Sequence, residues 1–409
     1  MTRWTGGTFA AFESRPFTVL WTGAFLAFIA FFMSTAVQSV VAFDLAGSNR
    51  AVGFVILAQG ISQLALGPFG GALADRVSKR LVIFVCQAVI TAAFLMAAIL
   101  IVTDTITIPL LALTSFAIGV AFSFLGPARQ GLLVEFVGPG LRGNAVALSQ
   151  VALNASRILA PFVAAAALGV GVIGPGGAYF GMTVLYLGAM ACTYSLPKSA
   201  PTTARRPPVF GEIWSGIKYV GRTPGIRILV PSYILVIMCG FPYVSVLPGL
   251  VKNEFGRDPS QITWLLTVNA IGGLMTSLAV ASMADSKRAP AVYTALCLLF
   301  GLALIATGLM PNYWLVFIPM FFVGAAGGGF QTLNGALVSH LVEPAYFGRV
   351  ISLTFLAFAS SSVVALPVGS IADAFGEAAT ISASGVVVCA LVVVFEVAGR
   401  LADRRTLAP

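Results

Sequence analysis

The sequence predicts an all-α integral membrane protein with twelve transmembrane helices in two pseudo-symmetric six-helix bundles. Three observations predict this fold: a very apolar composition, apolar runs of membrane-spanning length along the whole chain, and sequence patterns that occur once in each half. Hydrophobic residues make up 58% of the 409 residues and charged residues only 9%, whereas soluble domains are about 45–50% apolar. The composition therefore excludes an ordinary soluble protein.

The apolar runs are each about 20 residues or longer, which lets a helix cross a hydrocarbon core of about 30 Å. The first run is too long for the apolar core of a cleaved signal peptide, and no small-residue cleavage site ends it. We therefore expect it to remain as a helix. The predicted spans are residues 18–42, 52–74, 81–103, 108–132, 145–169, 173–196, 226–250, 261–284, 289–310, 313–338, 350–374 and 378–399.

The 23 Lys and Arg residues give a net charge of +9, which could also indicate a nucleic-acid partner. Twelve spans place both termini on one side of the membrane, and all but four basic residues fall on that side. The exceptions are Arg50, Lys252 and Arg257 in loops of the other side and Arg157 inside a span. By the positive-inside rule the termini are cytoplasmic. The charge therefore indicates topology, and no nucleic-acid partner is expected.

One long polar stretch, residues 198–225, divides the spans into six and six. We expect an N-terminal bundle over 1–197, a cytoplasmic linker over 198–225 with a short surface helix, and a C-terminal bundle over 226–409. Residues 51–80 resemble residues 261–288, and residues 131–149 resemble residues 335–353. Because both matches occur in the same order, two six-helix repeats are the economical explanation.

The loop after the second span carries GGALADRVSKR, residues 70–80. It resembles the signature of the major facilitator superfamily, with Ser78 where a glycine is usual and with matches at Gly71, Asp75, Arg76, Lys79 and Arg80. Residues 126–161, FGRVISL (347–353) and GSIADAFG (369–376) resemble the bacterial enterobactin and macrolide exporters. This resemblance implies a bacterial inner-membrane transporter that works by alternating access and exports drugs or siderophores.

The resemblance also implies a conformational switch at the cytoplasmic loop. Asp75 lies at a helix–loop junction, where a carboxylate can face the positive end of a neighbouring helix. Glu135, with Arg129 two turns before it, is the nearest acidic partner, and Arg349 belongs to the matching Gly-Arg-Val motif of the second half. In the family such a brace holds the outward-facing state. The alternative is that these charges only fix the topology.

The fifth span carries a charge in an apolar run, QVALNASRILAP. A charge near the centre of a membrane helix costs about 2.5–3.5 kcal/mol, so it should have a partner or face water. Gln150, Asn154, Arg157 and Pro161 are spaced by four, three and four residues, which places them on one helix face. This stripe is expected to line a cavity. The glycines of the family's antiporter signature are replaced here by alanines, so that signature alone does not indicate antiport.

Other polar residues lie in spans that border the central cavity in this family. The alternative is that these amides only bond helix to helix. Aromatic residues of the first span could add an apolar wall, although such stripes more often serve packing. The further candidates for the substrate cavity are Gln38, Gln59, Gln63, Asn269, Gln331, Asn334 and Trp264, and the aromatic residues are Phe25, Phe28, Phe31 and Phe32.

None of the 14 acidic residues lies near the centre of a predicted span. Proton-driven exporters of cationic drugs commonly need such an acid, so we expect a cavity that is neutral to positive and a neutral or anionic amphipathic substrate that faces Arg157. Asp44 is the best candidate for a proton site. The five cysteines have no metal-ligand spacing, so neither a metal nor a cofactor is expected.

The chain contains no phosphate loop, no ATP-binding motif and no nucleophile with a base, so we do not expect an enzyme. The first hypothesis is a monomeric secondary active exporter of a small drug-like or siderophore-like compound that uses the proton gradient. The second is a lipid or lysolipid flippase-like transporter in the same fold. The third is a non-transporting membrane sensor or scaffold.

Overall fold

The computed structural model describes residues 10–138, 141–169, 174–197, 209–281, 283, 286 and 288–406. The contacts between Cα atoms divide the chain into two compact units. Unit 1 comprises residues 1–45 and 61–206, and unit 2 comprises residues 46–60 and 207–409. The boundary near residue 206 falls inside the polar stretch that the sequence predicts as a linker. The predicted bundle limits at 197 and 226 stay a prediction.

The described part of the chain contains eleven helical stretches that are long and apolar enough to cross a membrane. They agree with eleven of the twelve predicted spans. The remaining span, 173–196, corresponds to α6, Gly174–Tyr194, which forms a helix of 21 residues. Apolar runs locate these helices well because a chain inside a bilayer must satisfy its own backbone hydrogen bonds.

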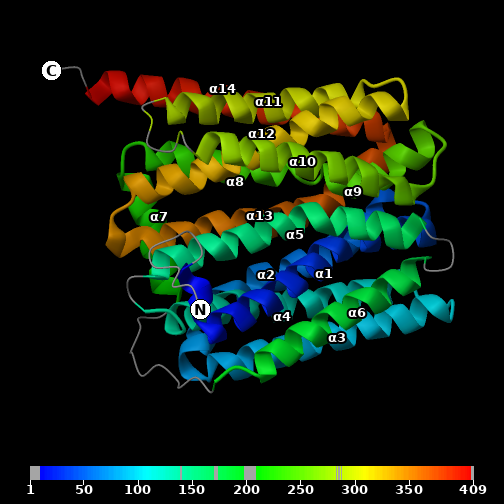
Figure 1. Ribbon diagram of the computed structural model, residues 1–409. Coiled ribbons are helices and arrows are strands. Elements are labelled where there is room, and N and C mark those ends of the chain that lie inside the picture. The colour runs from blue at the N-terminus through cyan, green and yellow to red at the C-terminus, as the bar shows by residue number, and fades with distance from the viewer. Residues whose placement is uncertain are drawn as a thin grey trace. The chain divides into compact units, whose positions relative to one another are not determined.

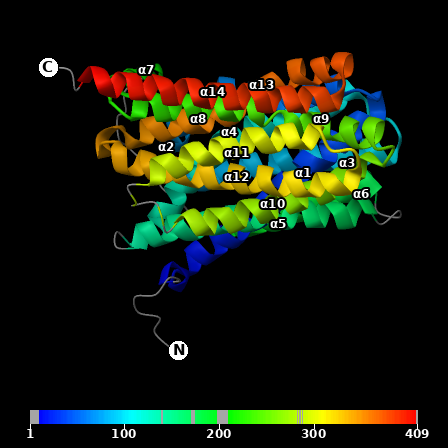
Figure 2. The same ribbon diagram turned by 90° about the horizontal axis from the view of Figure 1, so that it is seen from above.

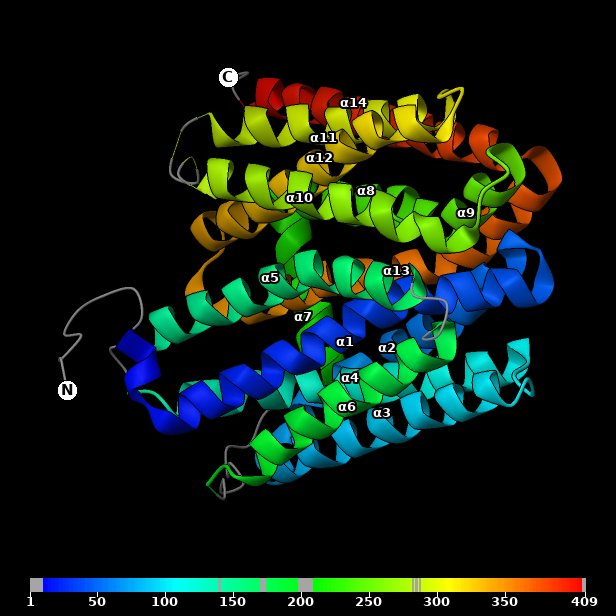
Figure 3. The same cartoon turned by 45° about the vertical axis from the view of Figure 1, so that its right-hand side comes forward.

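Unit 1 is a helical bundle in which α3 packs against both α4 and α6 (Figure 3). Because α3 is predominantly apolar after its first residues, it can bury one face against these neighbours and leave the other for lipid. The elements of this unit are η1 (Ala10–Glu13), α1 (Arg15–Ala46), α3 (Lys79–Val102), α4 (Ile108–Glu135), α5 (Arg142–Gly169) and α6.

Helix α2, Asn49–Arg76, is shared between the two units. Its residues up to Gly60 group with unit 2, and its residues from Ile61 onwards group with unit 1. Gly53 and Gly60 lie in the first part, where a Cβ atom would come within 2.5 Å of Ala365 O and 2.2 Å of Ser362 Cβ, respectively. The first part of α2 therefore packs tightly against α13 of unit 2.

Unit 2 repeats the packing of unit 1, since α11 packs against both α12 and α14 (Figures 1 and 2). These helices correspond to the ninth, tenth and twelfth predicted spans, as α3, α4 and α6 correspond to the third, fourth and sixth. The repeated pairing is the structural counterpart of the sequence repeats. The elements are α7 (Val209–Arg222), α8 (Ile226–Gly240), α9 (Tyr243–Gly249), η3 (Leu250–Glu254), η4 (Pro259–Gln261), α10 (Ile262–Ala281), α11 (Ala289–Gly308), α12 (Tyr313–Leu341), α13 (Pro344–Phe375) and α14 (Glu377–Thr406).

The seventh predicted span is not one regular helix. The stretch Ile226–Glu254 consists of α8, α9 and the π-helix η3. Pro242 precedes α9 and Pro248 lies inside it. Because proline has no backbone N–H and collides with the preceding turn, a continuous α-helix is interrupted here. Hydropathy detects the apolar length of the span but not this break.

The linker helix α7 packs against the beginning of α13. The rings of Tyr219 and Tyr346 are stacked with their centroids 4.2 Å apart, and the Tyr219 hydroxyl accepts a hydrogen bond from the backbone N–H of Glu343 at 3.1 Å. A Cβ atom on Gly216 would lie 3.2 Å from Arg349 Cβ. The polar linker is thus anchored to unit 2 by its helical second half.

Helices α10 and α12 meet along a seam of glycines in unit 2. A Cβ atom on Gly324 would lie 1.7 Å from the backbone oxygen of Asn269, and one on Gly272 would lie 2.3 Å from that of Phe321. A Cβ atom on Gly328 would lie 2.4 Å from the backbone oxygen of Gly273. The two backbones therefore touch directly, as small residues allow in membrane helix pairs. We call Gly272, Gly273, Gly324 and Gly328 the glycine seam.

We expect Gly324→Ala to destabilise the protein by about 1–3 kcal/mol, because the clash is with backbone and no side chain can move aside. The measurement is the thermal unfolding of the purified protein in detergent. Gly335→Ala on the same helix is the matched control, since nothing lies within 4 Å of its Cβ position. It should be neutral or slightly stabilising because alanine favours helix. Equal effects of both variants would contradict this account of the seam.

Candidate substrate and switch sites

Hydrogen bonds hold α5 against α1 in unit 1. The indole nitrogen of Trp21 donates to the backbone oxygen of Leu148 at 2.8 Å, and the Ser156 hydroxyl donates to the backbone oxygen of Phe25 at 3.3 Å. Ser156 is fully buried. These two bonds fix the position of α5 beside α1 and place the next residue, Arg157, near the aromatic residues of α1.

Two arginines of unit 1 lie over two phenylalanines of α1. The Arg157 guanidinium carbon is 5.3 Å from the Phe32 ring centroid, and the Arg129 guanidinium carbon is 4.5 Å from the Phe28 ring centroid. The Phe28 and Phe32 rings are themselves stacked, with centroids 6.5 Å apart. We call these four residues the arginine–phenylalanine cluster. Each cation–π contact contributes about 0.5–2 kcal/mol, which helps to offset the cost of the charges.

Arg129 is the more deeply buried of the two arginines, with an exposed fraction of 7%. Its Nη2 atom is buried and has no hydrogen-bond partner. A buried charged donor without a partner costs more than the about 1–3 kcal/mol of a neutral one. The cation–π contact with Phe28 involves the flat face of the guanidinium and leaves this N–H group without an acceptor. Arg129 therefore keeps a donor that an anionic ligand could use.

The polar stripe predicted on α5 stays accessible in part. Gln150 and Asn154 are exposed, Arg157 is half-buried and Pro161 is buried. Val151 and Leu159, on other faces, are also exposed, as expected for a helix that contacts lipid there. The stripe thus runs from an accessible end towards the arginine–phenylalanine cluster, and the structure brings Arg157 together with Phe32 on α1.

The other predicted amides mostly join helices inside their own unit. Gln38 is buried and accepts a hydrogen bond from Ser115 at 3.0 Å. The Asn269 amide donates to the Tyr243 hydroxyl at 3.2 Å and to the backbone oxygen of Met320 at 3.3 Å. Among the described contacts these amides do not converge on one site, and they remain candidates.

The remaining members of the predicted cavity differ in how accessible they are. Gln331 bonds to the backbone oxygen of Gly327 on its own helix at 2.9 Å. Asn334 is buried, and its Oδ1 atom has no partner. Gln59 and Gln63 are half-buried on α2, and Trp264 is 48% exposed. Of these residues, Asn334 is the one with a buried side-chain oxygen that could still accept a hydrogen bond from a ligand.

The predicted switch loop forms an ion pair within unit 1. Lys79 Nζ lies 3.2 Å from Glu135 Oε2, and Lys79 itself is buried at the start of α3. Its side chain passes close to Gly131, where a Cβ atom would come within 2.9 Å of Lys79 Cε. Glu135 thus pairs with Lys79, whereas Arg129 turns to Phe28. Ser78 has a φ angle of −52°, so this turn does not require the glycine that is usual in the family.

Arg80 binds the end of another helix. Its Nε atom donates to the backbone oxygen of Thr193 at 3.2 Å, and Nη2 donates to the backbone oxygen of Tyr194. A cation at the C-terminus of α6 satisfies unpaired carbonyl groups and opposes the negative end of the helix dipole. Arg349 lies with its guanidinium carbon 5.1 Å from the Tyr346 ring centroid. Gly71, Asp75 and Arg76 lie in the last turns of α2, and the structure does not describe the contacts of these three residues.

We expect Lys79 and Glu135 to be energetically coupled by about 0.5–1 kcal/mol, the upper part of the range for partly exposed pairs. A double-mutant cycle with Lys79→Met and Glu135→Gln, read by thermal unfolding at low and high salt, measures this coupling. Glu343→Gln, which removes an exposed acid from the N-cap of α13, serves as the control partner for Lys79→Met. Coupling that is absent, or as large with Glu343→Gln, would contradict the pairing.

One polar cluster of unit 2 was not predicted. Asp373 Oδ1 accepts hydrogen bonds from the backbone N–H of Asn49 at 2.7 Å and from its side-chain amide at 3.0 Å, and Asp373 Oδ2 accepts from the backbone N–H of Arg50 at 2.9 Å. Glu377 Oε1 accepts from the side-chain amides of Asn49 at 2.8 Å and Asn253 at 2.6 Å. We call Asn49, Asn253, Asp373 and Glu377 the Asn49 cluster.

The Asn49 cluster attaches the beginning of α2 to α13, α14 and η3. Asn49 is fully buried and Glu377 is 5% exposed, whereas Asp44, the predicted proton site, is exposed at the end of α1. The acids and amides lie near predicted span ends in the sequence, but nothing in a single sequence pairs residues that are 324 positions apart. Among the described acids, Glu377 of this cluster is therefore the buried carboxylate, whereas Asp373, like Asp44, is exposed.

Comparisons with known proteins agree with this architecture. The chain matches the family model described as transmembrane secretion effector over residues 6–406. Relatives include the staphyloferrin A transporter of Staphylococcus aureus, 24% identical over 84% of this chain and 86% of that protein. Multidrug resistance protein 2 of Bacillus subtilis is 21% identical over 80% of this chain and 81% of that protein.

Solved structures share the fold at low identity. A bacterial homologue of the human lysosomal transporter Spinster, in an inward-facing conformation, has a TM-score of 0.72 at 14% identity and covers 95% of both chains. The nucleoside transporter NupG has a TM-score of 0.75 at 13% identity and covers 93% of this chain and 99% of that one.

The fold and these matches define a multi-pass membrane transporter of the major facilitator superfamily, not an enzyme. Within that superfamily, the chain belongs to the transmembrane secretion effector family. The predicted fold and the predicted family are thus confirmed.

Proposed function

We propose that this transporter exports a small anionic or neutral amphipathic compound by alternating access and that the proton gradient drives the export. The arginine–phenylalanine cluster carries the proposal. It combines two guanidinium groups, one of them with an unused buried donor, with an aromatic surface. Such a combination suits a ligand with an anionic group attached to an apolar or aromatic body.

The relatives support a small-molecule cargo. One is named as a transporter of staphyloferrin A and others as multidrug resistance proteins. Their sequence identities to this chain are 21–24%, and sites on one fold can serve different substrates. The preference for an anion therefore rests on the two arginines of unit 1.

The polar stripe and the switch loop complete the proposal. Gln150 and Asn154 guide the substrate along α5 to Arg157, and the motif around Lys79 and Glu135 braces the cytoplasmic side in one of the two transport states. Both termini lie in the cytoplasm, as the distribution of basic residues predicts. Protons enter as the coupling ion, with Glu377, the buried acid of the Asn49 cluster, as a better candidate than Asp44.

Transport into inverted membrane vesicles tests this function. A panel of matched anionic, neutral and cationic amphiphiles is offered with an intact proton gradient and again after an uncoupler collapses it. We expect uptake of anionic or neutral compounds that stops without the gradient. Selective uptake of cationic compounds, or uptake unaffected by the uncoupler, would overturn the proposal. Movement restricted to lipids would instead support a flippase-like transporter.

A further inference from the structure

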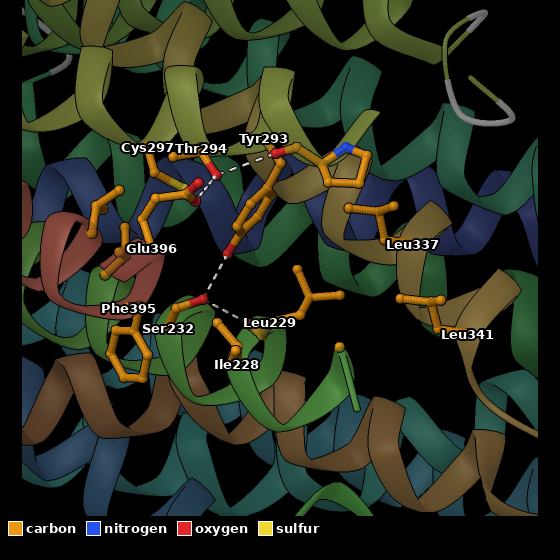
Figure 4. A pocket seen from close by; sticks show the side chains of 14 residues that line it. Ile228, Leu229, Ser232, Tyr293, Thr294, Cys297, Leu337, Leu341, Phe395 and Glu396 are labelled. Carbon is orange, nitrogen blue, oxygen red and sulfur yellow. Dashed lines mark hydrogen bonds between the residues drawn. The ribbon is translucent and has the colours of Figure 1, made fainter. Parts of the chain in front are cut away.

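A cavity lies in unit 2 between four helices, near one end of their membrane-length stretches. It has a volume of about 200 Å³ and is lined by side chains of α8, α11, α12 and α14 (Figure 4). Gly225 and Pro290 lie at the first turns of α8 and α11, and Leu341 ends α12. These helices are long enough to cross a membrane, so a cavity at their ends lies near the level of the lipid headgroups.

The cavity has one polar wall. Glu396 Oε2 accepts a hydrogen bond from the Thr294 hydroxyl at 3.2 Å, and the Tyr293 hydroxyl lies 3.5 Å from the Ser232 hydroxyl. Figure 4 shows Glu396 and Thr294 side by side in the wall and Tyr293 reaching towards Ser232. The wall thus presents a carboxylate and three hydroxyl groups, which are mainly hydrogen-bond acceptors for a cationic donor.

The rest of the lining is apolar and includes Leu229, Leu337 and Phe395. A carboxylate beside an apolar surface near the headgroup level favours a ligand with a cationic head and an alkyl chain, since the chain can follow the lipid while the head stays at the interface. The volume is below the about 300–1,000 Å³ of pockets for drug-sized ligands. The cavity therefore suits a head group with a short part of its chain.

We propose that this cavity binds the primary ammonium group of an alkylamine amphiphile, with Glu396 as the charged acceptor and Thr294 and Ser232 as further acceptors. A primary ammonium group donates three hydrogen bonds, which a quaternary ammonium group of the same charge cannot do. The same chemistry occurs in free alkylamines and in the ethanolamine headgroup of membrane lipids. The site is distinct from the arginine–phenylalanine cluster of unit 1 and prefers the opposite charge.

Binding to the purified transporter tests the proposal independently of transport. Calorimetric titration of octylamine is compared with octyltrimethylammonium and octanol, which share the chain but lack the donors or the charge. We expect octylamine to bind at least about tenfold more tightly than either, as one charge-assisted hydrogen bond implies. Glu396→Gln should remove this difference. Glu343→Gln, which neutralises an acid outside the cavity, should keep it.

Thr294→Val replaces the hydroxyl with a methyl group of nearly the same shape and should weaken octylamine binding, but by less than Glu396→Gln. If Glu396→Gln folds poorly, Thr294→Val still tests the proposal.

Native mass spectrometry from nanodiscs with equal phosphatidylethanolamine and phosphatidylcholine then shows whether the bound ammonium group belongs to a lipid or to a free amine. Ethanolamine lipid retained by the parent protein and lost in Glu396→Gln indicates a lipid, and binding of octylamine alone indicates a free amine. Unchanged octylamine affinity in Glu396→Gln, or equal binding of octanol, would overturn the proposal whatever Arg157 does in transport.

Discussion

Arg157→Gln is expected to lower the apparent affinity for an anionic substrate by about 10–100-fold, because a hydrogen bond to a charged group contributes about 1.5–3 kcal/mol. Arg129→Gln should have an effect at least as large, since Arg129 belongs to the same cluster and its Nη2 atom is buried without a hydrogen-bond partner. Initial rates of uptake into inverted vesicles over a range of substrate concentrations give the affinity for each variant.

The controls for this prediction come from the same unit. Arg142→Gln removes an exposed charge near the start of α5 and should leave the affinity unchanged. Phe32→Leu should weaken binding by a smaller factor, because it loses only the cation–π contact that orients Arg157. Neutral substrates should be affected less than anionic ones. Parental export of every substrate by both arginine variants would exclude the cluster as the substrate site.

Asp373→Ala is expected to destabilise the beginning of α2 by at least about 2 kcal/mol, because it removes the acceptor of three hydrogen bonds made by Asn49 and Arg50. Two of these donors are backbone N–H groups of the first turn, which have no partner inside the helix. Hydrogen exchange followed by mass spectrometry should show faster exchange of residues 49–52, together with a lower unfolding temperature.

Asp258→Ala is the matched control for this second prediction. The Asp258 side chain accepts a hydrogen bond from the backbone N–H of Ser260 at 2.8 Å and caps the start of the short helix η4. The substitution therefore removes an acid from a helix start of unit 2 without changing a contact of α2. Exchange at residues 49–52 should not change in this variant. If Asp373→Ala left that exchange at the parental rate, the Asn49 cluster would not hold α2 in solution.

The sequence predicts the helices far better than the site. The tenth predicted span, 313–338, agrees closely with α12, because the bilayer demands an apolar stretch of fixed length. The break near Pro242 was missed, since composition is equally apolar on both sides. Hydropathy measures how apolar a stretch is, and it does not register a local change in hydrogen bonding.

Arg157 could be predicted as a site residue because a charge in an apolar helix requires an explanation. The role of Phe28 and Phe32 could not be predicted. A phenylalanine in a membrane helix can contact lipid, a neighbouring helix or a guanidinium group, and its position in the sequence is the same in all three cases. Glu135 could be proposed from the sequence as the acidic partner of the basic loop, and it pairs with Lys79 of α3, but the position of Arg129 over Phe28 of α1 could not. Separation along one helix is known from sequence, and the neighbouring helix is not.

The glycine seam has a mechanical consequence. Where side chains separate two helices, rotamer changes let the helices slide or tilt against each other, but α10 and α12 touch backbone to backbone at Gly324 and Gly328. A displacement of one helix therefore carries the other with it, so α10 and α12 move as one rigid unit. In a protein that changes shape to move its cargo, this rigid pair transmits the movement, and the hinges lie in other helices or loops.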